Sequence, residues 1–508
     1  WSLSVEEQFY LLFPPLPLVL IRFVPKRINL VLLGLAVLSL AGAQAIVTRV
    51  PETAFYLVHL RAWELLAGAL LATGVVRPHN RQWIREGAAL LGLGMIVSSV
   101  FALDKQEAFP GISALPAVLG AALVIHAGVG GNTVVGRLLG FRVLVFFGLI
   151  SYSLYLWHWP LFVFAGYYQI EPLSGTEKVV LFILACLLGW LSWRFVESPF
   201  RKALEPVCRR QFFRRTGWVA GALILISLPG AISKGAAFRL PDTVADIASV
   251  EEEIIPFRRP CFGPTVDDVD KERDLCVLGT EGSANFLLWG DSHALSLAHG
   301  YDLAAKELGL SGRFLARSEC PPALGSREYR ASRVSCGEFN EAVVRYLERH
   351  PEIQQVILVG VWSSYVGNDT AQGTAKSDTG FEAGLTRSID YLVNSERRVT
   401  VVEQVPLIDY SVPQTLARAA WYGRDLELRL PRERHETRMA ESQLVFDALA
   451  EQYPIQRINL ADRLCDAGGC NVELDGLPLY RDSNHLSKWG STTVAQELQL
   501  GLRGDLQR

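Results

Sequence analysis

The feature that most constrains this chain is the contrast between its two halves. Residues 1–235 consist of long apolar stretches separated by short polar loops, whereas residues 236–508 have the mixed composition of an ordinary globular domain. A helix that crosses a bilayer needs about 20 mostly apolar residues. The pattern therefore predicts a multi-pass α-helical membrane domain, in contact with the lipid bilayer, followed by a globular domain. We predict spanning segments at residues 7–22, 28–48, 56–76, 84–103, 112–128, 143–167, 177–197 and 217–234.

Prolines fall inside two of these segments. A proline has no N–H for the helix interior, and its ring clashes with the preceding turn. Pro14, Pro15 and Pro17 interrupt the first segment, which we expect to be kinked or partly re-entrant. Pro160 is expected to kink the sixth.

The loops between the segments alternate in charge. The first loop contains Lys26 and Arg27, whereas the second balances Arg49 against Glu52, and the later loops continue the alternation. Positive charge marks the cytoplasmic side of a membrane. The odd loops are therefore predicted to be cytoplasmic, and the chain after residue 235 is predicted to emerge on the outer side.

Six of the eight cysteines lie in the second half. An even set of cysteines in a compact domain suits an oxidising compartment. Six thiols allow 15 pairings, and the alternative is six reduced thiols in a cytosolic domain. No close Cys-x-x-Cys pair is present, so we predict no metal site. We expect local disulfides, which join Cys261 to Cys276, Cys320 to Cys336 and Cys465 to Cys470.

Several ionisable residues lie where lipid is expected. Such residues are candidates for a functional site by default, and Glu6, Glu7, Arg61, Glu64 and His158 form this set. Arg61 and Glu64 are three residues apart and share one helical face. The alternative is an internal ion pair that only fixes helix packing, and for His158 a satisfied buried histidine is the favoured interpretation.

The second half alternates short apolar runs with helical patterns. This alternation predicts a three-layer α/β domain with a parallel sheet covered on both faces. Active residues collect at the carboxyl ends of such strands. The predicted strands are "NFLLW", "GRFLA", "VILVG", "VTVVEQV" and "IQRINL", and the predicted helices lie near 293–309, 337–350, 381–395, 432–453 and 488–501.

A Gly-Asp-Ser turn ends the first of these strands. Ser292 stands where a helix begins, and the free N–H groups of a helix N-terminus favour developing negative charge. Among the histidines, His485 in "DSNH" follows Asp482 by three residues and best suits a base. We expect Ser292 to attack, His485 to take its proton and Asp482 to hold the imidazole tautomer. The alternative is a tight turn and an unrelated surface loop.

The motifs in both halves resemble a known arrangement. "GDSH" with a late "DSNH" resembles the SGNH hydrolase superfamily, whose fold is flavodoxin-like, over residues 281–505. "WSLSVEEQFYLLFP", "RAWELLAGALLA", "SYSLYLWHWPLF" and "RFVESPFR" resemble the acyltransferase family 3 membrane proteins. The resulting domain division is 1–200 for a partial acyltransferase domain, 201–235 for a basic loop and an extra helix, 236–280 for a periplasmic linker and 281–508 for the SGNH-like domain.

The resemblance implies a function. Fused proteins of this kind O-acetylate envelope or surface glycans of bacteria, such as lipopolysaccharide O-antigen. It implies a bacterial inner-membrane protein with a periplasmic C-terminal domain, acetyl-CoA as acyl donor and a glycan as acceptor. Ser292 would carry the acyl group, and His485 would serve as base in both half-reactions. No basic stripe suggests a nucleic-acid partner, and neither the acceptor sugar nor the oligomeric state follows from these motifs.

Two departures from the family pattern stand out. The family's membrane histidine and basic motifs lie upstream of "WSLSVEEQFY", so the chain that starts at Trp1 is expected to be a fragment. The oxyanion-hole asparagine of the superfamily is replaced by Val361 and Trp362. Asn368 and the backbone N–H of Ser292 are the remaining candidate donors.

Two other functions remain open at this point. A membrane-tethered serine esterase would also use Ser292, but it would remove acyl groups rather than transfer them. A non-enzymatic scaffold with a glycan-binding outer domain would not need that hydroxyl.

Overall fold

The computed structural model describes residues 2–48, 50–77, 79–103, 109–169, 173–199, 209–233, 235, 237–258, 261–325, 336–371, 380–424, 426 and 428–503. The chain divides into two units, one comprising Trp1–Phe162 and Gly175–Glu205 and the other Val163–Ser174 and Pro206–Arg508. We call the first the membrane unit, and we call Val277–Arg503 within the second the α/β domain. The domain boundaries predicted at residues 200, 235 and 280 remain predictions.

The first part of the chain is helical. In the residues that the structure describes, six helices are long and apolar enough to cross a membrane: Pro25–Ile46, Gln82–Ala102, Ile112–Val129, Arg142–Gln169, Gly175–Glu197 and Phe213–Ile232. The last of these lies in α12 (Arg209–Ile232). The remaining bounds are α1 (Ser2–Leu12), α2 (Pro15–Phe23), α3 (Ile28–Ile46), α4 (Pro51–Tyr56), α5 (Val58–Ala72), α6 (Gln82–Ala102), α7 (Leu115–Val129), α8 (Val134–Leu139), α9 (Arg142–Gln169) and α10 (Gly175–Ser192).

Two of the eight predicted spans are not continuous helices of that length. The segment 7–22 is divided into α1 and α2 at the proline cluster, as the missing N–H groups require. The segment 56–76 contains α5, which has only 15 residues because Leu57 is extended and separates it from α4. The kink expected in segment 7–22 is confirmed, whereas the prediction of one full-length span over 56–76 was wrong.

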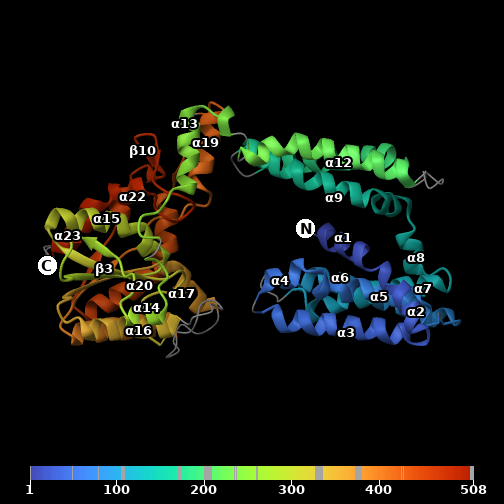
Figure 1. Cartoon of the computed structure of the whole chain (residues 1–508), viewed down its shortest axis with the longest axis horizontal. Helices are drawn as coiled ribbons and strands as arrows, with labels where there is room; N and C mark the ends of the chain where they lie inside the picture. The colour runs from blue at the N-terminus through green and yellow to red at the C-terminus, as the bar shows by residue number, and fades with distance from the viewer. Residues whose placement is uncertain are drawn as a thin grey trace. The chain divides into compact units, whose positions relative to one another are not determined.

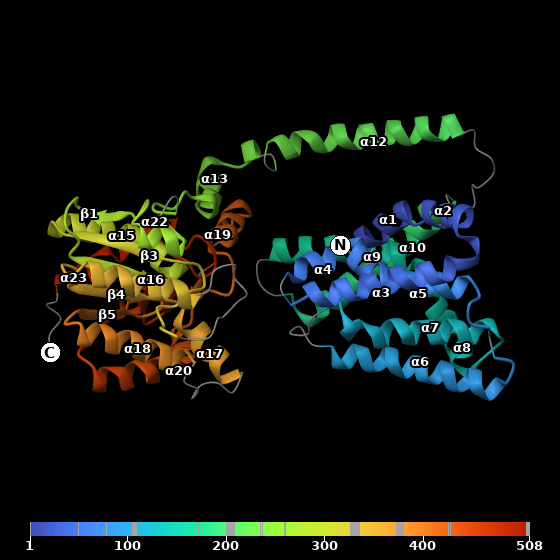
Figure 2. The ribbon, with the colours of Figure 1, turned by 60° about the horizontal axis from the view of Figure 1, so that its bottom comes forward.

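Close helix packing in the membrane unit depends on glycine. α6 and α7 lie side by side (Figure 2), and α3 lies beside α5. A Cβ at Gly92 would lie 2.6 Å from the carbonyl oxygen of Gly120, and a Cβ at Gly120 would lie equally close to that of Gly92. Only glycine at both positions allows this approach, which is a common way for helices to associate in lipid.

The α/β domain is built on a six-stranded sheet with the order β1-β3-β2-β4-β5-β7. β3, β2, β4, β5 and β7 are parallel, and all five were predicted from their apolar runs. β1 pairs antiparallel with β3, so the sheet is mixed rather than purely parallel. The short β1 lies on an edge, where three residues gave too little pattern for a prediction. The bounds are β1 (Val277–Gly279), β2 (Phe286–Gly290), β3 (Ser311–Ala316), β4 (Gln355–Val359), β5 (Arg398–Val402) and β7 (Ile455–Ile458).

Helices cover both faces of this sheet, in the predicted three layers. Figure 1 shows α15 and α23 on one side of the strands and α16 and α20 on the other. The α/β domain helices are α15 (Ser292–Leu308), α16 (Cys336–Arg349), α17 (Trp362–Ala371), α18 (Phe381–Asn394), α19 (Val412–Trp421), α20 (Arg432–Gln452), α21 (Ala461–Leu464), α22 (Lys488–Thr493) and α23 (Ala495–Arg503). α17 and α19 were not predicted, and the helix expected at 488–501 is divided into α22 and α23.

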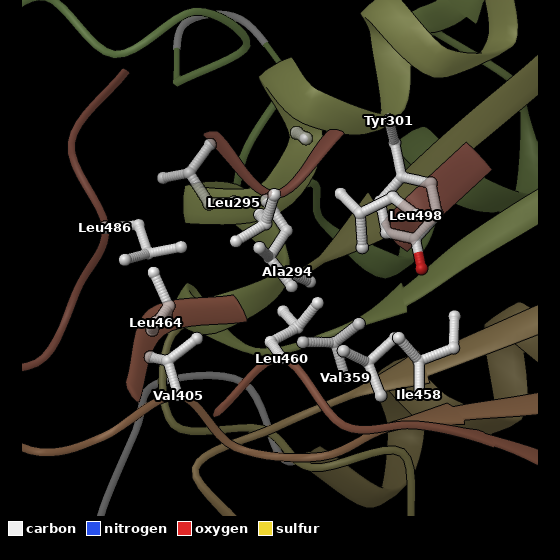
Figure 3. Close-up of a cluster of buried hydrophobic side chains, with 14 of the residues drawn as sticks. Ala294, Leu295, Tyr301, Val359, Val405, Ile458, Leu460, Leu464, Leu486 and Leu498 are labelled. Atoms are coloured by element: carbon white, nitrogen blue, oxygen red, sulfur yellow. The ribbon is translucent and has the colours of Figure 1, made fainter. Parts of the chain in front are cut away.

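The central strand β2 explains why two separate cores form. Every residue of β2 is buried, and successive side chains point to opposite faces. Phe286 and Leu288 enter the core beneath α15, and Leu287 and Trp289 enter the core beneath α16. Figure 3 shows the first core, in which Ala294 and Leu295 of α15 meet side chains from the other strands and from the C-terminal segment.

Smaller elements complete the C-terminal unit. α13 (Asp242–Ser249) and α14 (Val266–Asp270) precede the sheet. β6 (Arg429–Leu430), β9 (Gly469–Asn471) and β8 (Cys465–Asp466) form a three-stranded sheet, and β10 (Glu473–Leu474) pairs with β11 (Leu477–Pro478). Disulfides join Cys261 to Cys276, Cys320 to Cys336 and Cys465 to Cys470.

Candidate active site

The turn between β2 and α15 presents Ser292 at the carboxyl end of the central strand. Gly290 ends β2, and a Cβ there would lie 2.0 Å from the carbonyl oxygen of Val359 on β4, so only glycine fits. Asp291 is the N-cap of α15, and its side chain accepts a hydrogen bond from the N–H of His293. Ser292 is therefore the first residue of a capped helix, and its hydroxyl lies at the edge of the sheet.

The second part of the site is a short loop near the C-terminus. Tyr480 and Leu486 form an isolated antiparallel bridge that closes the loop. Within it, Asp482 Oδ1 accepts hydrogen bonds from the N–H groups of Asn484 (2.9 Å) and His485 (2.8 Å). These bonds fix the carboxylate beside the imidazole.

The two parts meet in a continuous hydrogen-bonded chain. His485 Nδ1 lies 2.8 Å from Asp482 Oδ2, and His485 Nε2 lies 2.7 Å from Ser292 Oγ. In the neutral imidazole, Nδ1–H donates to the carboxylate, and Nε2 accepts from the serine hydroxyl. The structure thus brings together the three residues that the sequence pattern selected, across 193 positions between the serine and the histidine.

The electrostatics favour an ionised Asp482 and a neutral His293. Partial burial alone would raise the pKa of Asp482, but the hydrogen bond and charge of His485 and two backbone N–H groups outweigh it and lower the pKa to about 2. His293, whose ring centroid lies 4.9 Å from that of His485, is fully buried. Burial and the neighbouring His485 lower the pKa of His293 to about 3. His293 therefore adds no charge beside the catalytic candidates.

A buried carboxylate ties the nucleophile turn to the next strand end. Asp291 Oδ2 accepts hydrogen bonds from the hydroxyl of Tyr365 (2.6 Å) and the N–H of Val361 (2.9 Å). Burial raises the pKa of Asp291, and these bonds, with one from the N–H of His293, oppose the rise. The start of α17 is thus held against the start of α15.

Gln404, beyond the end of β5, holds the same helix from the other side. Its Oε1 accepts from both the N–H and the hydroxyl of Ser363, each at 3.0 Å. Ser364 follows between the two held residues, Ser363 and Tyr365, and its side chain lines the cavity in front of Ser292. Among the described residues the Ser364 hydroxyl has no hydrogen-bond partner.

The hydroxyl of Ser292 opens onto a cavity of about 490 Å³. This volume is in the range of small-molecule sites. Its wall combines the triad candidates with polar groups from other segments: Arg258, Ser318, Glu319, Ser364, Arg481 and Asn484.

The other predicted site residues lie elsewhere or outside the described part. Asn368 falls within α17, but its side chain is outside the described residues. Arg61 and Glu64 form a pair with two hydrogen bonds, Nε to Oε1 at 2.9 Å and Nη2 to Oε2 at 2.8 Å. The His158 Nδ1 lies 2.7 Å from the carbonyl oxygen of Tyr155. No interaction among the described residues links Glu6, Glu7 or His158 to that pair.

Several residues of the site were not predicted. Ser364 and Tyr365 follow the carboxyl end of the predicted strand "VILVG", which is the position where site residues were expected. The strand pattern could have singled out these two. Gln404 lies within the predicted strand "VTVVEQV" and comes after a strand end only because β5 stops at Val402. Arg258 belongs to no strand, and only the fold brings it to the cavity.

Comparisons with known proteins assign both halves. A family described as an acyltransferase domain matches residues 1–194. A family described as an SGNH domain fused to AT3 domains matches residues 260–499.

Individual known proteins are similar to parts of the chain. The O-acetyltransferase OatA of Staphylococcus aureus (strain MRSA252) is 28% identical over 250 residues, which cover 46% of this chain and 41% of the relative. The putative peptidoglycan O-acetyltransferase YrhL of Bacillus subtilis (strain 168) is 30% identical over 237 residues, 42% of this chain and 36% of the relative. The chain thus spans less than half the length of these relatives. The periplasmic domain of the lipopolysaccharide acetyltransferase of Salmonella ser. Paratyphi A matches with a TM-score of 0.39 and 15% identity, covering 53% of this chain and 99% of that domain.

Proposed function

Because the chain belongs to the proteins that join an acyltransferase domain to an SGNH domain, we propose that it is a membrane O-acetyltransferase. It moves an acetyl group from cytoplasmic acetyl-CoA to a hydroxyl group of a cell-surface or periplasmic glycan. The observation that carries this proposal is the hydrogen-bonded chain Ser292–His485–Asp482 at the wall of a cavity. The names of the relatives support the same class of reaction.

In the first half-reaction, Ser292 is the acyl acceptor. Its Oγ attacks the acetyl carbonyl carbon, and its proton moves to His485 Nε2. His485 then returns that proton to the departing group, which leaves acetyl-Ser292. Asp482 stays ionised throughout and stabilises the imidazolium, in keeping with its low pKa.

In the second half-reaction, the same base activates the glycan. His485 Nε2 takes the proton of a sugar hydroxyl, whose oxygen attacks the acetyl-Ser292 carbonyl. Collapse of the tetrahedral intermediate returns the proton to Ser292 Oγ and releases the acetylated glycan. One histidine therefore serves both steps, and the cavity must admit a sugar next to it.

Each tetrahedral intermediate carries an oxyanion that needs hydrogen-bond donors. The N–H groups of His293, Ala294 and Leu295 are bonded to Asp291, but that of Ser292 has no partner within the described residues. We assign the Ser292 N–H and the Ser364 hydroxyl as the two donors. Ser364 takes the place of the asparagine that the superfamily pattern has and this chain lacks.

The proposed location is a bacterial inner membrane, with the α/β domain in the periplasm. Three disulfides in the C-terminal unit fit an oxidising compartment. The alternation of basic loops along residues 1–235 supports the same orientation.

The decisive experiment follows a labelled acetyl group. Membrane vesicles that contain the protein receive [¹⁴C]acetyl-CoA on the cytoplasmic side and glycan on the other, and label in the glycan is counted. In a parallel assay with the full chain, 4-nitrophenyl acetate replaces acetyl-CoA as the acetyl donor and is added on the side of the α/β domain. Label or acetyl ester in the glycan, lost in Ser292→Ala, supports the proposal. Release of free acetate without any glycan ester identifies an esterase instead.

A further inference from the structure

We infer that the catalytic cavity takes an acidic acceptor, a sugar whose carboxylate is held by Arg481 and Arg258 while a hydroxyl of the sugar faces Ser292. This inference rests on the proposed function for the reaction, but it concerns recognition and can be tested without turnover. It names the class of substrate, which the triad alone leaves open.

The two guanidinium groups differ from those arginines of the C-terminal unit that pair with a carboxylate. Arg345 donates to both oxygens of Asp270, at 3.1 and 2.9 Å, and Arg457 pairs with Glu403 at 2.7 Å. Arg481 and Arg258 line the catalytic cavity, yet neither pairs with a carboxylate in the part of the chain that the structure describes. Positive charge without a partner is thus concentrated where the substrate must enter.

Arg481 is held in place by the loop that carries the base. Its backbone N–H donates to the carbonyl oxygen of His485 at 3.0 Å. Its side-chain Nε is buried and has no hydrogen-bond partner within the described part of the chain. A buried guanidinium N–H without an acceptor is unfavourable until a ligand supplies one. Arg258 comes from the segment after α13 and is exposed, so its charge adds to the entrance.

The acidic groups on the cavity wall do not cancel this charge. Asp482 is engaged by His485 through two hydrogen bonds. Glu319, the other carboxylate on the wall, has an interaction partner of its own. An incoming anion therefore meets two guanidinium groups for which the described residues provide no carboxylate partner.

A carboxylate is the ligand that best suits this arrangement. The planar guanidinium donates two parallel N–H groups that match the two oxygens of a carboxylate. In a uronic acid the carboxylate is attached to the ring only a few bonds from the hydroxyl groups. Holding the acid at Arg481, four residues before His485, orients one hydroxyl toward the base and Ser292, and such orientation is itself a large part of catalysis.

The test measures binding by full-length Ser292→Ala protein in detergent micelles. The first pair of ligands is trigalacturonic acid and its methyl ester, which is similar in shape but uncharged. The second pair is the corresponding glucuronic acid trisaccharide and its methyl ester. Calorimetry is expected to give a Kd about tenfold lower for an acid than for its ester. Arg481→Gln in the same background is expected to remove this preference. Arg258→Gln, at a more exposed site, should reduce it about threefold.

Arg503→Gln at the exposed end of α23 is the matched control, and its acid-to-ester ratio is expected to equal that of the parent. Thermal melting checks that Arg481→Gln is folded, and Arg258→Gln tests the same prediction at a site where folding is not at risk. Equal Kd values for acid and ester overturn the inference. Inorganic phosphate and free galacturonate are then compared as competitors of the bound acid. If phosphate displaces the acid at a lower concentration than galacturonate does, the site binds phosphate and the carboxylate assignment is overturned.

Transfer assays separate this inference from the proposed function. With active protein and 4-nitrophenyl acetate, acetyl ester should form faster on the acids than on their methyl esters. Preferential binding of the acids without any transfer to them contradicts the proposed function but leaves the recognition of acids standing. Transfer at equal rates to acid and ester supports the proposed function and overturns the inference.

Discussion

The Arg61–Glu64 pair of the membrane unit and the Ser292–His485–Asp482 chain of the α/β domain differ in what they leave unsatisfied. Arg61 uses two donors on both oxygens of Glu64, and the rings of Phe55 and Phe109 lie within 5.4 and 5.8 Å of its guanidinium carbon. The triad chain ends instead at a hydroxyl on the wall of a cavity. Polar groups that satisfy one another stabilise a fold, whereas a chain with one open end can act on a ligand.

The largest effect is expected at that open end. Ser292→Ala removes the acyl carrier, so acetyl transfer should fall by on the order of 10³-fold or more, with the melting temperature unchanged. Rates are measured with labelled acetyl-CoA in vesicles. Ser395→Ala, at the end of α18, is the control and should keep the parental rate. If the Ser292→Ala protein still acetylates glycan, the hydrogen-bonded chain has no catalytic role and only stabilises the fold, as the Arg61–Glu64 pair is expected to do.

The next largest effect is expected on stability, at the membrane pair. Arg61→Met leaves the partly buried Glu64 carboxylate without its partner and should lower the free energy of unfolding by about 3 kcal/mol. The double variant Arg61→Met/Glu64→Leu removes both charges and should recover most of that loss, with transfer activity retained. Melting in detergent and the vesicle assay measure the two quantities. Loss of transfer in a stable double variant would instead make the pair part of the acyl-donor site.

A smaller effect separates two neighbouring hydroxyl groups. Ser364→Ala removes a proposed oxyanion donor and should lower kcat by about 10- to 100-fold with little change in KM. Ser363→Ala removes a hydroxyl that already donates to Gln404, and its effect is expected to stay within about threefold. Steady-state kinetics with 4-nitrophenyl acetate compare the two. Equal effects would mean that Ser364 only supports the fold, as Ser363 does.

The effect that is smallest near neutral pH, and that grows only on acidification, concerns the His293 imidazole. The pKa of His293 is lowered to about 3 in the folded protein, whereas an unfolded histidine titrates near 6.5. Between these values the unfolded state binds the extra proton, so stability is complete above about pH 6.5 and falls by about 1.4 kcal/mol per pH unit below it. His293→Phe cannot take up a proton, and its melting temperature should fall less between pH 6.5 and 4. Identical pH dependence in the two proteins would contradict a neutral, buried His293.

Sequence patterns identified those parts of the protein whose functional residues are close together in the sequence or whose apolar residues form a continuous run. Asp482 and His485 are three residues apart, and the Gly290 turn follows a fully apolar strand, so both could be selected from the chain alone. The five parallel strands were found for the same reason, since buried strands are continuous apolar runs. No such pattern marks β1, which forms by pairing at the edge of the sheet, or the break between α22 and α23, which depends on local packing.

The surroundings of the triad depend on the tertiary structure. Gln404 lies beyond one strand end and Ser363 just after another, and only the sheet order brings the two together. The Arg258 guanidinium reaches the cavity from a segment that precedes the sheet altogether. Such contacts between distant segments carry no periodicity. The sequence pattern pointed to Asn368 as an oxyanion donor, and the side chain of Asn368 lies outside the described residues.

Ser292 and His485 are 193 positions apart in the sequence, so the proposed site is complete only after both segments have folded. In the proposed mechanism, Ser292 carries an ordinary alcohol until the last segment, which holds Asp482 and His485 side by side, packs next to the start of α15. Molecules that lack the final few dozen residues are then expected to be inert toward acyl esters. In the proposed mechanism, reactivity reports completion of the whole domain.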